Sequence, residues 1–253
     1  MKSDDIEFLN RLKNIKVTLL FTYSGIENRS IEPYPSVHAI ESLRLMSAPK
    51  KREYKTILYW RPIVPGLNDS IKHIQQARRF SELADATVFT GLFYRDEIAS
   101  FYQENELPIP YNRSARRKIV PEMLERRILS EFGNSIRLFR KTSCAVSYVH
   151  SVPDYNGHYG IKEICDICPK HQVDICAENH KVPTRDRILT AARPLPEAKN
   201  LEVIRITDRA AIVAGLEAEQ PRYFLQHSLQ FQFHDQRLPH LPGRHGRADI
   251  GWE

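Results

Sequence analysis

The order of the predicted secondary structure is the feature that most restricts the fold. From residue 15 onward, short runs rich in β-branched and aromatic residues alternate with amphipathic stretches of helical period. The predicted strands span residues 15–23, 55–63, 86–92 and 136–139. Parallel strands need such crossovers, so this order predicts parallel β/α units. Right-handed crossovers curl the strands, and we expect an α/β protein built on a partial parallel (β/α) barrel.

A barrel of about four such units is incomplete and leaves a strand edge open. The strand at 15–23 comes first in the chain and should form this exposed edge. We expect another chain, a missing N-terminal segment or the helix near residues 8–12 to cover it. A completing partner along this edge is therefore predicted.

The character of the chain changes twice after the predicted barrel. Residues 143–180 hold all four cysteines, and residues 181–253 show two helical stretches and two short strands. We predict three parts: a partial barrel at 1–142, a cysteine-rich metal-binding segment at 143–180, and a small α+β appendage at 181–253. From His234 onward no periodicity is visible, which favours a loop or tail.

Composition excludes several classes of protein. A chain of 253 residues can bury a core without disulfides, and no apolar run approaches the ~20 residues of a membrane span. The charged N-terminus does not resemble a secretory signal, which favours a cytoplasmic protein. The net charge of +6 suits a polyanionic partner such as nucleic acid.

The cysteines are spaced as metal ligands. Cys165 and Cys168 are separated by two residues, which lets both sulfurs point at one ion from a tight turn. Cys176 follows, and Cys144 precedes the pair. We predict that these four cysteines hold an iron–sulfur cluster or zinc, because clustered thiols in a reducing compartment indicate ligands more than disulfides. Four histidines flank the cysteines, and one of them could replace a sulfur ligand. Cys144 is the cysteine whose place a histidine would take first. The four histidines are His150, His158, His171 and His180.

Two other groups are candidates for function. A loop containing glycine and proline could supply acid, base or hydrogen-bonding groups. Its polar residues are His150, Asp154, Tyr155, His158 and Tyr159, and the catalytic candidates among them are His150, Tyr155 and His158. The alternative is a polar loop that packs around the metal. A basic stretch beside Tyr111 suits phosphates and a stacked base, or else forms a solvated helix start. Its residues are Arg113, Arg116, Arg117 and Lys118.

Three motifs in the first part of the chain suggest a family. They are Tyr23-Ser24-Gly25, Ile31-Glu32-Pro33 and the nine residues 61–69, Arg-Pro-Ile-Val-Pro-Gly-Leu-Asn-Asp. Residues 15–140 resemble the middle and later part of a radical S-adenosylmethionine barrel, in the branch of spore photoproduct lyase and its DNA-photolyase-like relatives. The resemblance implies that residues 63–68 pack beside the adenine of S-adenosylmethionine. It also implies that six residues lie at the cofactor and substrate site: Tyr23, Ser24, Arg61, Pro65, Gly66 and Thr90.

The family's Cys-x-x-x-Cys-x-x-Cys motif, which normally precedes these strands, is absent from this chain. Cys165, Cys168 and Cys176 have a different spacing and follow the strands, where some family members carry an auxiliary cluster. The resemblance therefore implies the C-terminal part or subunit of a radical S-adenosylmethionine enzyme acting on nucleic acid or a related substrate. The alternative is a non-catalytic, zinc-stabilised basic module that binds nucleic acid or a protein partner.

Overall fold

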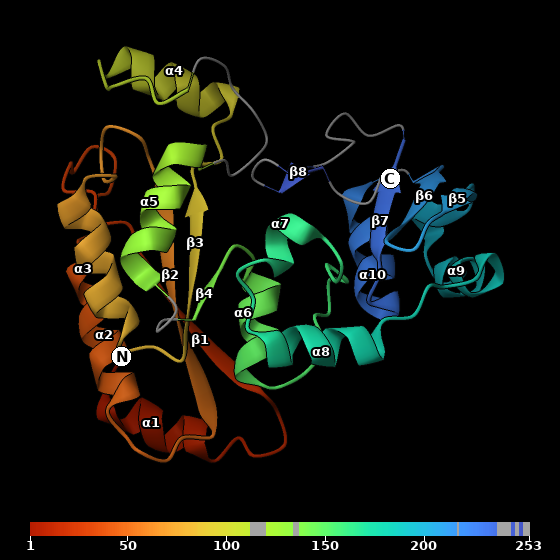
Figure 1. Cartoon of the computed structure of the whole chain (residues 1–253), viewed down its shortest axis with the longest axis horizontal. Coiled ribbons are helices and arrows are strands. Elements are labelled where there is room, and N and C mark those ends of the chain that lie inside the picture. The colour runs from red at the N-terminus through yellow and green to blue at the C-terminus, as the bar shows by residue number, and fades with distance from the viewer. Residues whose placement is uncertain (112–119, 134–136, 217, 237–243, 246–247, 250–253) are drawn as a thin grey trace. The chain divides into compact units, whose positions relative to one another are not determined.

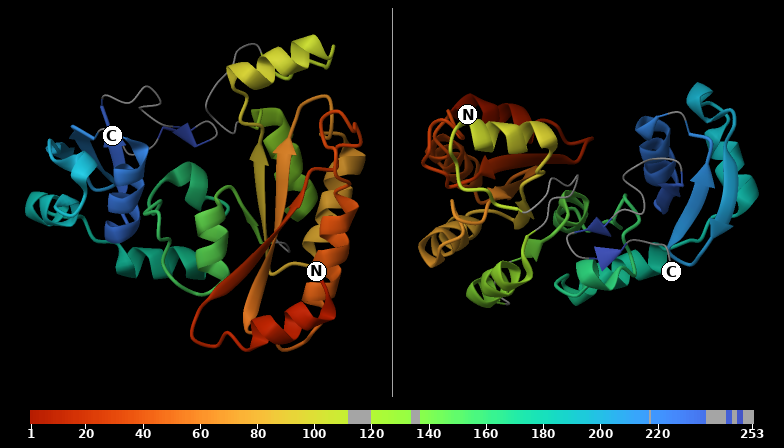
Figure 2. Two further views of the ribbon diagram at one scale, coloured as in Figure 1. Left: turned by 180° about the vertical axis from the view of Figure 1, so that it is seen from behind. Right: turned by 90° about the horizontal axis from the view of Figure 1, so that it is seen from above.

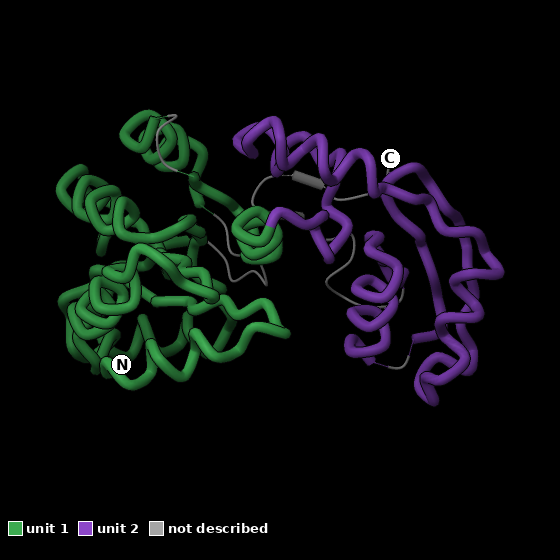
Figure 3. Tube along the Cα trace, turned by 90° about the horizontal axis from the view of Figure 1, so that it is seen from below, with its two compact units in different colours: residues 1–150 green, residues 151–253 purple. Residues whose placement is uncertain are grey.

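The computed structural model describes residues 1–111, 120–133, 137–216, 218–236, 244–245 and 248–249. The chain forms two compact units, Met1–His150 and Ser151–Glu253, and each is described by itself (Figure 3). The division falls after His150, whereas the sequence predicted boundaries after residues 142 and 180. The cysteine-rich segment after His150 therefore groups with the C-terminal α+β part. Among the described residues no helix is long and apolar enough to cross a membrane.

A four-stranded parallel sheet is the centre of the first unit (Figure 1). Its strands lie in the order β1 (Val17–Tyr23), β2 (Tyr54–Ile63), β3 (Ala86–Gly91) and β4 (Leu138–Phe139). Helices alternate with the strands: α1 (Ser3–Asn10), α2 (Val37–Ser47), α3 (Ile71–Ser81), α4 (Asp96–Glu104), α5 (Glu122–Phe132) and α6 (Thr142–Val149). The predicted α/β class, with parallel strands and intervening helices, is confirmed.

One face of this sheet carries the core of the first unit. The register pairs Tyr23 with Trp60 and Trp60 with Phe89, so these buried residues share a face. The Tyr23 ring meets Phe80 of α3 edge-on at 5.1 Å, and Trp60 stacks on Phe132 of α5 at 5.7 Å. Helices α2 and α3 run along the sheet in both side views (Figures 1 and 2).

The opposite face of the sheet is more polar and partly open. Phe139 lies on this face and packs on Tyr148 of α6, with the ring centroids 5.1 Å apart. A hydrogen bond of 2.8 Å joins Thr18 Oγ1 to His150 Nε2. Helix α6 and the residue after it therefore cover the part near the amino end of β1. Toward the carboxyl end, Thr22 stays exposed.

Strand β1 pairs with β2 alone among the described strands, so it is an edge strand as predicted. Leu20 in its middle is 41% exposed. Helix α1 buries none of its residues. The Met1 amino group, which precedes α1, donates to Ser42 Oγ of α2, and Asn10 Oδ1 at the end of α1 accepts from the amide of Glu53 ahead of β2.

The second unit joins the cysteine-bearing helices to a small mixed sheet. The helices are α7 (Lys162–Cys165), α8 (Lys170–Asn179), α9 (Arg185–Ala192), η2 (Pro196–Ala198) and α10 (Glu219–Leu229). The sheet order is β5 (Glu202–Ile206), β6 (Ala210–Ala214) and β7 (Gln232–Asp235), with β5 antiparallel and β7 parallel to β6. Two further short strands, β8 (Arg244–His245) and β9 (Ala248–Asp249), pair antiparallel. The apolar core gathers around Ile188, Val213, Leu225, Phe231 and Phe233.

The α+β character of this C-terminal part is confirmed, but the prediction of a loop or tail from His234 is wrong at its start. His234 and Asp235 belong to strand β7. All four residues of β7 are buried, polar ones included, so the strand shows no alternation of apolar and polar side chains. A strand buried on both faces gives no period-2 signal in the sequence.

Candidate metal centre

Local structure brings the three later cysteines into one neighbourhood of the second unit. Cys165 ends α7, and the amide of Cys168 donates to the Cys165 carbonyl at 3.1 Å, which closes a tight turn. Pro169 then precedes α8, which carries Cys176. The two-residue spacing therefore forms the kind of turn that the sequence predicted.

Nitrogen donors are directed at two of these sulfurs. Cys176 Sγ accepts from the amide of Asp154 at 3.5 Å and from Nε2 of Gln172 at 3.4 Å. A backbone hydrogen bond from Gly160 lowers the pKa of Cys165 and opposes the effect of burial there. Such N–H groups favour the charged thiolate, which is the form that binds a metal. This donor arrangement fits a cysteine ligand set.

The three thiols influence one another electrostatically. Burial, the largest cause, raises the pKa of Cys165, Cys168 and Cys176. For Cys168 the charges of Cys165 and Cys176 add to burial and bring its pKa to about 12. The thiols are therefore protonated when no cation is bound. A metal ion would reverse this preference, because cations stabilise thiolates.

A buried carboxylate–imidazole pair lies beside these thiols. Asp154 Oδ2 accepts from both the amide and Nδ1 of His158, each at 2.8 Å. The charge of Asp154 also raises the pKa of all three cysteines. The backbone carbonyl of His158 accepts from Cys165 Sγ at 3.8 Å. The loop that carries Asp154 and His158 is thus part of the thiol neighbourhood.

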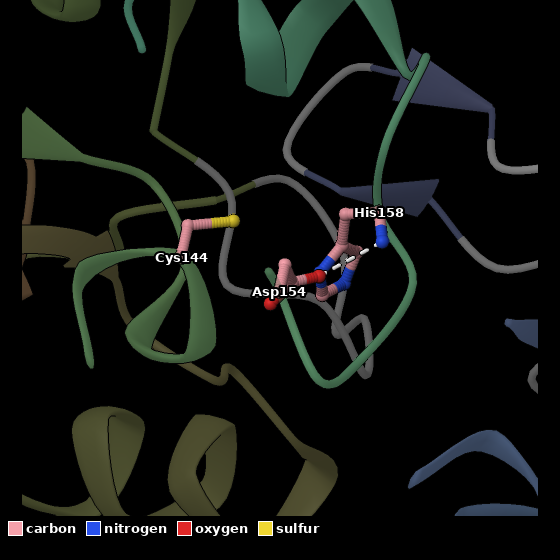
Figure 4. A group of neighbouring side chains, drawn as sticks. All are labelled: Cys144, Asp154 and His158. Atoms are coloured by element: carbon pink, nitrogen blue, oxygen red, sulfur yellow. Dashed lines mark hydrogen bonds and ion pairs between the residues drawn. The ribbon is translucent and has the colours of Figure 1, made fainter. Parts of the chain in front are cut away.

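Cys144, Asp154 and His158 form a buried group that could hold a metal ion (Figure 4). Their ligand atoms all lie within 4.8 Å of one another. Within the described ranges, this is the sole group of three or more such side chains that meets this distance. Cys165, Cys168 and Cys176 do not belong to a group that meets this distance among the described residues. Sequence reasoning named Asp154 as a possible acid or base of this loop but not as a candidate metal ligand, although its position four residues before His158 was a usable signal.

The predicted catalytic candidates have structural contacts. His150 bonds to Thr18 near the amino end of β1, the end away from Tyr23. Burial and then the charge of Lys16 lower the pKa of His150. The ring of Tyr155 meets His227 edge-on at 5.5 Å, and His158 is paired with Asp154.

The residues predicted at a cofactor site are divided between the two faces of the sheet. Tyr23 is buried toward α3, and burial followed by the charge of Glu27 raises its pKa to about 12. Ser24 Oγ lies 3.0 Å from Ser36 Oγ and accepts from the amide of Ile26. Both residues are therefore used within the fold.

Arg61 and Thr90 lie on the opposite, more polar face. The Arg61 guanidinium stacks on the Tyr59 ring at 4.7 Å and donates to its hydroxyl at 3.3 Å. Thr90 Oγ1 is buried and makes no hydrogen bond to any residue that the structure describes. Thr22 and Tyr59 share this face by register, and sequence reasoning missed both. The period of two along each strand could have found them.

The loop containing Pro65 and Gly66 is fastened to the end of β1. Gly66 has φ +82°, a conformation that favours glycine. Asn68 is fully buried, and its Oδ1 accepts from the amide of Val64 at 2.7 Å. Its Nδ2 donates to the Ser24 carbonyl at 2.6 Å and to the Pro62 carbonyl at 2.8 Å. One side chain therefore holds together the loops at the carboxyl ends of two strands.

Comparison with family models, curated proteins and solved structures found no match. The interpretation of the site therefore rests on its chemistry. The predicted nucleic-acid-binding residues Arg113, Arg116, Arg117 and Lys118 lie outside the described residues.

Proposed function

We propose that this chain binds a metal centre through Cys165, Cys168 and Cys176, with Cys144 or a side chain of the Asp154–His158 loop as a further ligand. The observation that carries the proposal is the set of nitrogen donors directed at two partly buried thiols, Cys176 and Cys165, with Cys168 in the turn that follows Cys165. Cysteines that only fill a hydrophobic core require neither N–H donors to their sulfurs nor other thiols nearby.

We further propose that the centre is an auxiliary iron–sulfur cluster, and that the chain is the C-terminal part or subunit of a radical S-adenosylmethionine enzyme acting on nucleic acid or a related substrate. Thiolates are the usual ligands of such clusters, and N–H groups aimed at the sulfurs tune their reduction potentials. A bound cluster would supply one-electron chemistry. The residues of this chain would hold the cluster, exclude water from it and orient its thiolate ligands.

The parallel sheet supports a cofactor site in the first unit. Ligands of α/β proteins bind at the carboxyl ends of the strands, where Arg61 and Thr90 lie on one face. A guanidinium suits the carboxylate of S-adenosylmethionine. The open edge of β1 fits a completing chain or segment that supplies the missing three-cysteine motif.

A second candidate is a zinc-stabilised basic module that binds nucleic acid or a protein partner without catalysis. The group of Cys144, Asp154 and His158 favours it, because sulfur, oxygen and nitrogen together are donors typical of zinc. In this second candidate the metal stabilises the folded chain and takes no part in catalysis.

The first experiment is anaerobic purification with measurement of iron, acid-labile sulfide and zinc. A brown protein with iron and sulfide supports the cluster, and a colourless protein with one zinc after anaerobic reconstitution would contradict it. Protein without any metal after reconstitution would contradict both proposals.

Ligand identity is tested by substitution. We expect Cys168→Ser to reduce the bound metal to background, because one of the thiolates of the turn is lost. Cys144→Ser and His158→Gln separate the alternatives, since both should lose metal if the mixed group binds it. Lys170→Gln is the control, because its side chain is 87% exposed beside Cys168. Unchanged metal content in Cys168→Ser would contradict the thiol site.

A further inference from the structure

The loop between Asp154 and His158 is held by the C-terminal α+β part of the same unit. Asn156 Oδ1 accepts from Nε2 of Gln226 in α10 at 3.0 Å. The Asn156 carbonyl accepts from Nε2 of Gln232 in β7. Gln226 and Gln232 are both almost fully buried. Two buried amide side chains, one from a helix and one from a strand, thus have partners in this single loop residue.

Gly157, the next residue, lies directly against the turn between α10 and β7. It has φ +67°, and a Cβ there would lie 2.5 Å from both the Gln230 carbonyl oxygen and Phe231 Cα. Both neighbours are backbone atoms, so a side chain cannot be accommodated by a rotamer change. The absence of a side chain lets the loop approach the turn this closely.

This contact lies between two parts with different roles. On one side, the amide of Gly157 donates to the Asp154 carbonyl, and Asp154 binds His158 and donates to Cys176. On the other side, Phe231 is fully buried in the core beside Phe233. His180, at the end of α8, also packs on Phe231 at 5.7 Å. The loop at Gly157 and the ring of His180 therefore connect the thiol-bearing helices to the core of the mixed sheet.

We infer that metal binding and the folding of the α+β part, residues 181–235, are coupled through Asn156 and Gly157, which act as positioning residues for the metal loop. The inference rests on the proposed metal centre. A metal that binds the folded loop better than the unfolded one stabilises everything that packs on that loop. By reciprocity, loosening the contact with the turn weakens metal binding although no ligand is changed.

The experiment compares two glycine variants of the full chain under reducing conditions, with Zn²⁺ as the probe because thiolate sites bind it. Gly157→Ala introduces the backbone clash. Gly133→Ala is the matched control, because Gly133 also has a positive φ, +58°, and a Cβ there would meet nothing within 4 Å. Both variants carry the strain of alanine in a left-handed conformation, so their difference isolates the contact.

We expect Gly157→Ala to bind Zn²⁺ about tenfold more weakly than Gly133→Ala in a chelator competition assay. In the wild-type chain, Zn²⁺ should slow amide hydrogen exchange in β5, β6 and β7, which contain no cysteine. Asn156→Ala tests the same contact if Gly157→Ala does not fold. It should weaken Zn²⁺ binding relative to Asn179→Ala, which removes an exposed asparagine bonded within α8.

Equal Zn²⁺ affinity in the two glycine variants would overturn the coupling and leave the metal centre intact. Protection by Zn²⁺ confined to residues 151–180 would do the same. A wild-type chain that binds no Zn²⁺ and no iron would overturn the metal centre and the coupling together. The failures of the two proposals are therefore distinguishable.

Discussion

At the scale of single residues, neighbouring positions in β1 have opposite environments. Thr22 is exposed on the more polar face of the sheet, while Tyr23 is buried against Phe80. The family resemblance implied that Tyr23 lies at a cofactor site. The alternation of side chains places it toward α3, and Thr22 lies on the face of Arg61 instead. The position of the strand end was predictable. The face of the sheet on which its last side chain lies depended on the side where the helices pack.

Tyr23 should make the stability of the first unit sensitive to alkaline pH. Burial raises the pKa of Tyr23 to about 12, above its ordinary value of 10.0. The neutral phenol's contribution is complete below about pH 10 and is lost as pH rises toward about 12. Tyr23→Phe keeps the ring packing and removes this titration. We expect its free energy of unfolding to fall less than that of the wild type between about pH 9 and 11.5.

Denaturant unfolding at a series of pH values measures this difference. Tyr34→Phe is the control, because Tyr34 is 82% exposed. Parallel pH profiles for Tyr23→Phe and the wild type would contradict the prediction.

At the scale of elements, the pattern of the sequence located helices and strands better than their ends. Ser36 directly precedes α2, a position where serine usually caps the helix, but its hydroxyl bonds to Ser24 and caps no helix amide. Ser70 does cap α3, accepting from the amide of His73. Both serines precede an amphipathic run, so local sequence could not distinguish them. The nearby end of β1 decided the partner of Ser36.

Asn68 should be the most sensitive position of the loop after β2. Asn68→Ala removes three hydrogen bonds, two of them buried, and leaves the amide of Val64 and two carbonyls without this partner. We expect the free energy of unfolding to fall by about 2–4 kcal/mol, measured by chemical denaturation. Asn105→Ala is the control, because its exposed side chain makes a single bond to the Phe101 carbonyl. Equal losses in the two variants would refute this role of Asn68.

At the scale of the whole molecule, the α/β class and the α+β character of the C-terminal part were predictable from the order of elements. The boundary between the compact units was not. Helix α6 carries Cys144 and belongs to the first unit, because Tyr148 packs on Phe139 of the sheet. In sequence, Cys144 is grouped with the other cysteines. Packing contacts, which the spacing of cysteines does not encode, decided the division.

The net charge of +6 makes nucleic-acid binding testable on the whole chain. We expect an affinity for single-stranded oligonucleotides that falls steeply with salt, measured by fluorescence anisotropy. Replacing Arg113, Arg116, Arg117 and Lys118 by glutamine should reduce the slope of log K against log salt by up to about 3. The exposed pair Lys50→Gln and Lys51→Gln is the control. Binding that is independent of salt would argue against phosphate recognition.

The sequence alone determined the order of parallel strands and helices, the turn from Cys165 to Cys168 and the edge position of β1 among the described strands. Each follows from local periodicity, spacing or position in the chain. Tertiary structure decided the facing of Tyr23 and Arg61, the burial of β7, and the pairing of the Asp154–His158 loop with Gln226 and Gln232. These depend on contacts between residues far apart in the chain or on the side from which helices pack, and such contacts leave no periodic signal in the sequence.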